Sequence, residues 1–250
     1  MAPLDVLAKV ETPDVVAAAQ ATTLNALYGE ASAHDILKVA IEDLFPGRLA
    51  LVSSFGAESA VLLHILSEVD RTLPVIFLDT GRLFAETLQY RTQLAEYLGL
   101  TDVRTVTPDP ERLAAKDPHR ALWMTNPDLC CFVRKTEPLQ RALNGFDAWV
   151  TGRKRFQNAV RSSLPVFEAD GHRIKVNPLI DWTVADLKDH AEKHRLPEHP
   201  LVAQGYPSIG CVPCTSRVLP GEDPRAGRWR GLGKTECGIH VDTEIDGSGI

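Results

Sequence analysis

Four of the five cysteines lie in two short clusters, an arrangement suited to binding metal. Cys130 and Cys131 are adjacent, and Cys211 and Cys214 are separated by two residues. Four thiolates can close one tetrahedral zinc site or hold an iron–sulfur cluster. Zinc ligands are usually separated by about two to four residues, because neighbouring residues chelate one small ion with strain, whereas a cubane offers a separate iron to each thiolate. The adjacent pair therefore favours a cubane, with a zinc site or buried free cysteines as alternatives.

The fifth cysteine stands apart from these clusters. Cys237 lies 13 residues from the end of the chain, with Lys234 and His240 nearby in sequence. These two side chains are placed to favour its thiolate, which is the nucleophilic form. Terminal segments are mobile unless tied down, and mobility suits a cysteine that meets a substrate first and a protein reductant later. An incidental exposed thiol is the alternative.

Basic residues gather near these cysteines although the whole chain is acidic. Its 250 residues carry 33 acidic side chains and 27 Lys plus Arg, a formal net charge of −6, which excludes a globally basic nucleic-acid binder. Residues 148–167 contain four cations and no carboxylate, and Lys135 follows the cysteine pair by about one helical turn. We expect a compact, multiply anionic substrate rather than a polymer. Solvated surface charge is the alternative, and we assign it to Arg217 and Arg230.

Short apolar segments alternate with amphipathic ones along most of the chain. Strands are predicted at residues 49–52, 75–78, 103–106, 148–150 and 173–176. Helices are predicted at residues 33–45, 59–69 and 184–194 and in a segment that ends at Gly99. This alternation favours βαβ units and a mostly parallel sheet covered on both faces. Beyond residue 196, repeated proline and glycine exclude long regular elements.

Three polar loops follow predicted strands, beginning at Ser53, Asp79 and Gly152. Ligands of such sheets bind at the carboxyl ends of the strands, so we expect these loops to converge on one crevice. The first loop resembles the Ser-Gly-Gly-x-Asp-Ser phosphate loop of ATP pyrophosphatases, with Phe55 in place of a glycine and Glu58 in place of the aspartate. These departures favour a smaller phosphate ester over a magnesium-bound triphosphate, and a plain turn is the alternative.

The chain contains no recognisable signal peptide and no membrane span. Residues 1–14 have no apolar core segment or cleavage site, and no apolar run approaches the roughly 18 residues that cross a bilayer. We therefore expect a cytoplasmic protein, in a reducing compartment where cysteine clusters usually bind metal or do redox chemistry. We divide the chain into an N-terminal helical segment (residues 1–30), a nucleotide-binding α/β domain (31–215) and a C-terminal tail (216–250).

Three sequence blocks closely resemble assimilatory adenosine 5′-phosphosulfate (APS) reductases, of the PAPS/APS reductase family. They are Cys-Cys-Phe-Val-Arg-Lys-Thr-Glu-Pro at residues 130–138, Ile-Gly-Cys-Val-Pro-Cys at 209–214 and Glu-Cys-Gly-Ile-His at 236–240. The family ends in Glu-Cys-Gly-Leu-His, so Ile239 is a mild departure. Reductases of 3′-phosphoadenosine 5′-phosphosulfate (PAPS) share the last block, but most lack the four upstream cysteines, which therefore point to APS.

The resemblance implies the fold, the reaction and the roles of the cysteines. The fold is α/β, a doubly wound, mostly parallel sheet of the adenine-nucleotide alpha-hydrolase (ATP pyrophosphatase-like) type with an irregular C-terminal segment. The reaction is the reduction of APS to sulfite and AMP, in sulfate assimilation and cysteine biosynthesis, by thioredoxin or a glutaredoxin-like reductant. Cys237 is the implied nucleophile and forms an S-sulfocysteine. The implied ligands of a [4Fe-4S] cluster are Cys130, Cys131, Cys211 and Cys214.

The resemblance also implies the residues that contact the substrate. Cations against the phosphosulfate are Lys135, Arg161, Arg225 and Arg228, and His240 is a further contact. On the adenosine side we expect Ser53, Asp79, Thr80, Gly81 and Gly152. No contact with nucleic acid or membrane is expected, and a homo-oligomer is left open. The alternatives are PAPS reduction on the same scaffold, an ATP-dependent adenylating or thiolating enzyme, and a zinc module without catalysis.

Overall fold

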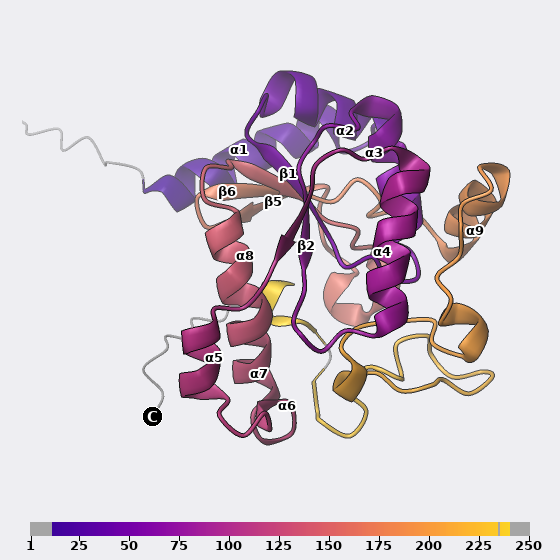
Figure 1. Cartoon of the computed structure of the whole chain (residues 1–250). Coiled ribbons are helices and arrows are strands. Elements are labelled where there is room, and N and C mark those ends of the chain that lie inside the picture. Colours follow the sequence, from indigo (N-terminus) through magenta and orange to yellow (C-terminus); the bar gives the residue numbers. More distant parts are fainter. Residues whose placement is uncertain (1–11, 235, 241–250) are drawn as a thin grey trace, which may run out of the picture.

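A mostly parallel sheet forms the centre of the protein (Figure 1). This computed structural model describes residues 12–234 and 236–240, so the predicted start of the chain (1–11) and the end of the tail (241–250) lie outside the described residues. The described strands are β1 (Leu49–Ser53), β2 (Val75–Leu78), β3 (Val103–Val106), β4 (Ala148–Val150), β5 (Phe167–Asp170) and β6 (Arg173–Val176). They form one sheet in the order β3-β2-β1-β4-β6-β5, and only β5 runs antiparallel to its neighbour. The predicted fold class is confirmed.

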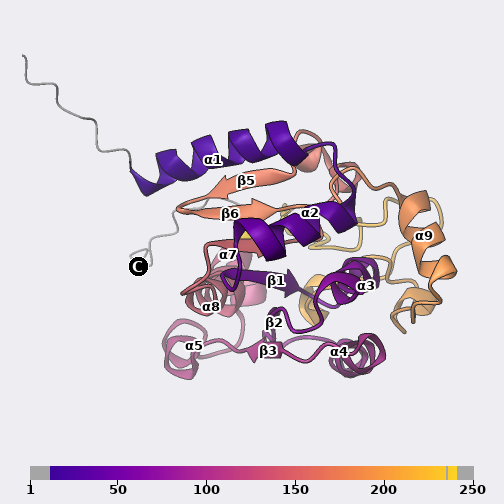
Figure 2. The same ribbon diagram turned by 90° about the horizontal axis from the view of Figure 1, so that it is seen from above.

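Helices cover both faces of this sheet, as Figure 2 shows with α3 and α4 on one side and α5 and α8 on the other. The helix bounds are α1 (Pro13–Tyr28), α2 (Ala33–Val39), α3 (Ser59–Val69), α4 (Ala85–Leu98), α5 (Pro110–Lys116), α6 (Leu122–Thr125), α7 (Pro127–Cys131), α8 (Glu137–Ala142) and α9 (Val184–Lys193). The larger core packs α1 to α4 against one face of the strands, through side chains such as Leu51 and Phe77. The smaller core packs α8 against Ala50, Ile76 and Trp149 on the other face. The apolar strand sequences are therefore buried on both sides, as a parallel sheet requires.

The predicted helix at residues 33–45 is confirmed in position but not in regularity. Ser32 caps α2 by accepting the N–H of Asp35 at 3.1 Å. From Ala40 to Leu44 the helix continues as a wider π-helical turn before Phe45 ends it. Such a turn contains one residue more than an α-helical turn, so the side chains that follow it are rotated about the helix axis.

Between β3 and β4 the chain forms four short helices that the sequence did not predict. Each is only four to seven residues long, and three of them have a proline in the first turn. Proline fits there because its missing N–H has no helical partner at that position. These helices position important side chains, since α7 ends in Cys130 and Cys131 and the π-helical turn that follows carries Lys135.

After α9 the described chain forms only short 3₁₀ turns and isolated bridges, as the proline content predicted. One bridge joins Leu83 to Cys211, and another joins Thr215 to Arg228. The first bridge therefore ties this irregular segment to the loop after β2, and the second lies within the segment. No helix among the described residues is long and apolar enough to cross a membrane.

One buried histidine predicts how stability depends on pH. His199 is fully buried; its Nδ1 accepts the N–H of Leu201 at 3.2 Å, so Nε2–H donates to Thr87 Oγ1 at 3.1 Å. Burial lowers the pKa of His199 to about 4, whereas an unfolded histidine has a pKa near 6.5. The unfolded state therefore binds more protons between these values, and stability falls as the pH drops from about 6.5 to about 4, by roughly 3 kcal/mol from this group.

This expectation can be checked by urea unfolding at a series of pH values. In the His199→Gln variant, the slope of the unfolding free energy against pH should be smaller over this interval, by the equivalent of about one bound proton. The exposed His34 supplies the control, because His34→Gln leaves the buried group in place. Identical pH slopes for wild type and His199→Gln would contradict the assignment.

Candidate active site

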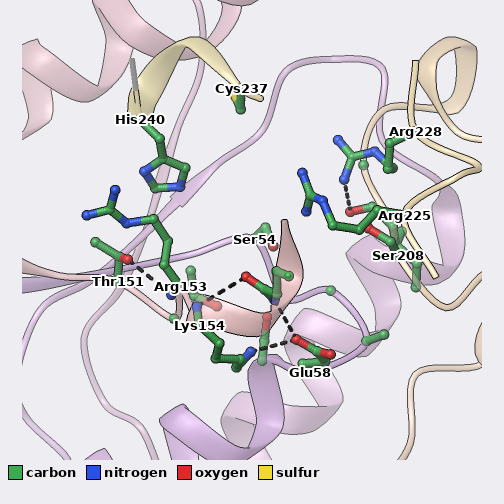
Figure 3. A pocket seen from close by; sticks show the side chains of 18 of the residues that line it. Ser54, Glu58, Thr151, Arg153, Lys154, Ser208, Arg225, Arg228, Cys237 and His240 are labelled. Carbon is green, nitrogen blue, oxygen red and sulfur yellow. Dashed lines mark hydrogen bonds and ion pairs between the residues drawn. The ribbon is translucent and has the colours of Figure 1, made fainter. Parts of the chain in front are cut away.

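A cavity of about 350 Å³ lies at the carboxyl ends of β1 and β4 (Figure 3). Its walls come from the loop after β1, from residues 151–157 after β4, and from residues 207–210 and 223–229 of the irregular segment. The end of the described tail, residues 236–240, closes it from another side. A volume of this size fits a small molecule such as a nucleotide. The predicted convergence of the Ser53 and Gly152 loops is confirmed.

Most of the residues predicted from the sequence line this cavity. They are Ser53, Lys135, Gly152, Arg161, Arg225, Arg228, Cys237 and His240. The loop Asp79, Thr80 and Gly81 is not among the lining residues. Instead, Thr80 Oγ1 lies 3.2 Å from Cys211 Sγ, and the Thr80 carbonyl accepts a bond of 2.8 Å from Arg134. The loop after β2 therefore lies against the cysteine clusters and does not line the cavity.

The loop after β1 has the local geometry of an anion-binding turn. Ser53 Oγ accepts the N–H of Phe55 at 3.1 Å, and Ser59 begins α3 at the cavity wall. Helix N-termini attract anions through their free N–H groups and dipole. Phe55 has a φ of 47°, the left-handed region, which explains why related loops carry glycine here. Its fully buried ring packs edge-on against Phe77 at 5.5 Å, which offsets a strain of about 1–2 kcal/mol.

Glu58, at the position of the phosphate-loop aspartate, joins this loop to the one after β4. Its Oε2 accepts hydrogen bonds from Lys154 Nζ at 2.6 Å and from Gln157 Nε2 at 2.8 Å (Figure 3). Lys154 is buried, and burial lowers its pKa although the carboxylate of Glu58 opposes this effect. Glu58 thus holds one side of the cavity in shape through an ion pair between two loops.

Cys237 lies in this cavity among cations from several segments. The neighbouring Cys131 sulfur, Lys135, the N–H of Ile239 and Arg228 lower the pKa of Cys237 well below its ordinary value, while burial opposes this effect. Lys135 stays charged, because the effect of burial on its pKa is outweighed by the nearby sulfur atoms. The surroundings of Cys237 therefore favour its thiolate, the form that attacks electrophiles.

The residue just before Cys237 fixes the tail to the cavity. Glu236 accepts two bonds of 2.7 Å from Arg161, a bidentate pair in which both side chains are about 7% exposed. Asn158 donates to the same carboxylate, and Arg225 Nη2 lies 3.9 Å from it. In this structure the predicted substrate cation Arg161 therefore binds a carboxylate of the tail.

The two neighbours expected to favour the Cys237 thiolate behave differently. Lys234 pairs with Asp128 of α7 and so anchors the tail beside the cysteine pair. His240 stacks parallel to Trp149, with ring centroids 6.1 Å apart. Burial and nearby cations lower the pKa of His240 well below its ordinary range. His240 is therefore neutral and supplies no positive charge, while its buried Nδ1 has no hydrogen-bond partner among the described residues.

Arg228 is held in place by an aromatic ring and a glycine. Its guanidinium lies 4.3 Å from the centre of the Trp229 ring and donates to the Ile209 carbonyl at 3.3 Å. A Cβ on Gly210 would lie 2.4 Å from Arg228 Nη2, so only glycine leaves room for this side chain. The buried Nε of Arg228 has no partner among the described residues. This cation therefore has hydrogen-bonding capacity to spare for a ligand.

The four paired cysteines line a second, smaller cavity directly behind the first. Cys130 and Cys131 come from α7, and Cys211 and Cys214 flank a 3₁₀ turn. All four are free of disulfides. Three residues, Lys135, Arg228 and Trp229, line both cavities and form the wall between them.

The spacing of these sulfur atoms fits a cluster better than a single ion. Four thiolates on one zinc lie about 3.8 Å apart, given Zn–S bonds of about 2.3 Å. Among the described residues, however, a set of three possible ligand atoms within 4.8 Å of one another occurs only at His64, Glu68 and His194, so no three of the four sulfurs are that close. A wider set of four thiolates suits an iron–sulfur cluster, in which each sulfur binds its own iron.

The chain matches the family model described as the phosphoadenosine phosphosulfate reductase domain over residues 48–217. It belongs to the phosphoadenosine phosphosulfate reductase family. The match to this reductase family begins just before β1 and includes all four paired cysteines, but Arg225, Arg228 and Cys237 lie beyond it.

Relatives of this reductase family agree with the assignment. The chain is 55% identical to the adenosine 5′-phosphosulfate reductase of Mesorhizobium japonicum over 224 residues, covering 90% of this chain and 88% of that one. It is 40% identical to the protein of the same name from Mycolicibacterium smegmatis, covering 85% and 89% of the two chains. Such identity over most of both chains implies a shared fold.

Solved structures give the same fold. The chain is similar to the crystal structure of the phosphoadenylyl-sulfate (PAPS) reductase of Candida auris in its phosphate complex, with a TM-score of 0.67 and 32% identity over 79% of this chain and 96% of that one. It also resembles Candida glabrata FMN adenylyltransferase, with a TM-score of 0.52 and 17% identity, covering 80% and 74% of the two chains. The second likeness shows the fold alone.

Sequence reasoning missed several residues that line the cavity of this family member. Arg153 and Lys154 were counted as part of a basic segment but not assigned to the site, and both are buried beside it. Arg153 is held by Glu168 at 2.7 Å and by Asn177. Their signal was their position directly after β4, at the same sheet edge as Ser53.

Proposed function

We propose that this chain reduces adenosine 5′-phosphosulfate to sulfite and AMP, with thioredoxin or a glutaredoxin-like protein as the electron donor. The observation that carries the proposal is the position of Cys237, which lines a nucleotide-sized cavity together with the cations Lys135, Arg225 and Arg228. The names of the relatives support the choice of substrate. The four paired cysteines support it further, because the terminal block alone is shared with PAPS reductases.

The reaction follows from the chemistry of a thiolate and a sulfuryl group. Cys237 Sγ attacks the sulfur of the phosphosulfate, an S–S bond forms, and the bond between sulfur and the phosphate oxygen breaks. AMP leaves with that electron pair, and the enzyme holds an S-sulfocysteine. A thioredoxin thiolate then attacks Cys237 Sγ, and sulfite leaves with the electrons of the S–S bond. The second thioredoxin thiol resolves the mixed disulfide and restores Cys237, so one dithiol supplies both electrons.

The cations of the cavity are assigned to the charge that moves in this step. Negative charge develops on the phosphate oxygen as it leaves, and fixed cations stabilise it most where water is excluded. Arg228 has a buried Nε with no partner among the described residues, and Lys135 is half-buried. We assign both to the phosphosulfate. We assign Arg161 and Arg225 to the same group once the ion pair between Arg161 and Glu236 has opened.

We assign the four paired cysteines to a [4Fe-4S] cluster. The adjacent pair Cys130 and Cys131 and the wide spacing of the four sulfurs support this choice over zinc. Such a cluster supplies a compact charged group on the far side of the wall that contains Lys135. Because the dithiol provides both electrons, the proposed reaction requires none from the cluster. The charge of the cluster would act on the active-site cavity through Lys135 and Arg228, which line both cavities.

The deciding experiment measures sulfite formation with APS and with PAPS, with thioredoxin supplied and withheld. We expect sulfite from APS only when the reductant is present, and a stoichiometric S-sulfocysteine when it is withheld. Preference for PAPS would favour the alternative reductase. Absence of sulfite from either compound, together with conversion of ATP to AMP and pyrophosphate, would overturn reduction in favour of an adenylating enzyme.

Gly210→Ala tests the role of Arg228 without altering its charge. The added methyl would fall 2.4 Å from Arg228 Nη2, so the guanidinium must move. We expect kcat/KM for APS reduction to fall by about 100-fold, the usual cost of losing one correctly oriented hydrogen-bond donor. The double variant Gly210→Ala with Arg228→Ala should be no slower than Arg228→Ala alone. Additive losses in that cycle would contradict the assignment.

A further inference from the structure

Two pairs of metal-binding side chains face each other between α3 and α9, away from the cavity. His64 and Glu68 are four residues apart on α3, and His190 and His194 are four apart at the end of α9. Residues with this spacing share one face of a helix. The two helices pack together beside the sheet (Figures 1 and 2). Neither the cavity nor the cysteine clusters use these four side chains.

The distances within this group are those of a metal site. One ligand atom from each of His64, Glu68 and His194 lies within 4.8 Å of the other two. His64 Nδ1 is 3.6 Å from Glu68 Oε2, and the rings of His64 and His194 are 4.3 Å apart. Ligand atoms bound tetrahedrally to one zinc at about 2.0–2.2 Å are about 3.3–3.6 Å apart, so the pair His64 and Glu68 already fits and His194 has to approach by about 1 Å.

The fourth side chain supports the other three. His190 Nε2 lies 3.2 Å from His64 Nδ1, its ring stacks on that of His194 at 4.4 Å, and Trp182 packs edge-on against it at 5.4 Å. His190 is therefore in contact with the rings of both histidines of the group.

We infer that His64, Glu68 and His194 form a binding site for a divalent transition metal, best matched by Zn²⁺, with His190 as the adjoining imidazole. Two neutral imidazoles and one carboxylate suit zinc rather than Ca²⁺ or Mg²⁺, which prefer oxygen ligands only. The side chains of His64 and His194 are half-buried and that of Glu68 is 45% exposed, so an ion can reach the group from solvent.

A metal here would connect two helices, α3 and α9, that lead to different parts of the candidate active site. Helix α3 begins at the anion-binding loop, and α9 leads into the segment that carries Cys211 and Cys214. Zn²⁺ would bind this site in the folded chain more tightly than it binds the unfolded chain, so it would raise thermal stability. This inference does not depend on the proposed reaction, since none of its ligands lines the cavity.

The test is a Zn²⁺ titration of the full chain as isolated, without a histidine tag, for wild type and His194→Gln. We expect one equivalent outside the cysteine clusters, bound about 100-fold more weakly by His194→Gln. His34→Gln is the matched control, because His34 is an exposed histidine 3.6 Å from the Asp35 carboxylate, and it should bind like wild type. Co²⁺ substitution should give visible d–d bands without thiolate-to-cobalt charge transfer.

A second variant keeps the result independent of folding. Glu68→Gln alters an exposed side chain, so it should keep the wild-type circular dichroism and lose the zinc-dependent rise in Tm. Equal zinc affinity in wild type, His194→Gln and Glu68→Gln would overturn the site. So would a cobalt spectrum dominated by thiolate ligation, or the absence of this equivalent in folded wild type.

Discussion

Cys237→Ser should abolish sulfite formation, lowering turnover by about 10⁴-fold or more, because a serine hydroxyl stays protonated where the thiolate is the nucleophile. The substitution changes one atom, so the contacts of Glu236 with Arg161 remain. APS binding should therefore persist. Mass spectrometry after incubation with APS alone should show the sulfonate adduct on wild type and none on the variant.

The same variant separates the nucleophile from the cysteine clusters. Its iron content, colour and APS affinity should equal those of wild type, because Cys237 is not among the four residues assigned to the cluster. Continued release of sulfite by Cys237→Ser would show that another residue is the nucleophile. Loss of colour together with activity would instead place Cys237 among the ligands.

Replacing one of the paired cysteines should have the second largest effect. Cys214 is half-buried, whereas Cys130, Cys131 and Cys211 are buried, so Cys214→Ser disturbs packing least. We expect loss of iron and acid-labile sulfide and a fall in activity of about 100-fold or more, since loss of a ligand exceeds the 10–100-fold cost of altering its surroundings. Activity should fall because Lys135 and Arg228, which line the candidate active site, also line the cavity of the four cysteines.

Metal and sulfide analysis of wild type and Cys214→Ser checks this expectation. Circular dichroism of the two proteins serves as the folding control. Wild type that is colourless, holds zinc and lacks iron would overturn the cluster. Full iron content in Cys214→Ser would show that this residue is not a ligand.

Much of the sheet was predictable because its strands are short apolar runs. The runs at β1, β2 and β4 are buried on both faces, and such segments have no other stable place in a globular protein. Strand β5 was missed because its sequence, Phe-Glu-Ala-Asp, lies at the edge and only its first residue is fully buried. The short helices of residues 110–142 were missed because four to seven residues give no helical period.

The site was predictable where chemistry leaves a pattern and not where packing decides. Cysteine spacing and the terminal block singled out the residues that the structure gathers around two adjoining cavities. The loop at Asp79 was assigned to the adenosine side because parallel strands end together, yet Thr80 turns to Cys211. The partners of Arg161 and Lys154 come from about 75 and 96 residues away, a pairing that no local pattern records.

The ion pair between Glu236 and Arg161 links two equilibria, the binding of a ligand in the cavity and the docking of the tail. Any oxyanion that binds the Arg161 guanidinium competes with Glu236 for the same N–H groups. By reciprocity, each event weakens the other by the same factor. A ligand that takes Arg161 from Glu236 thus weakens one contact of the tail, while the pair between Lys234 and Asp128 remains. The Glu236 carboxylate is therefore a built-in competitor for any anion that enters the cavity.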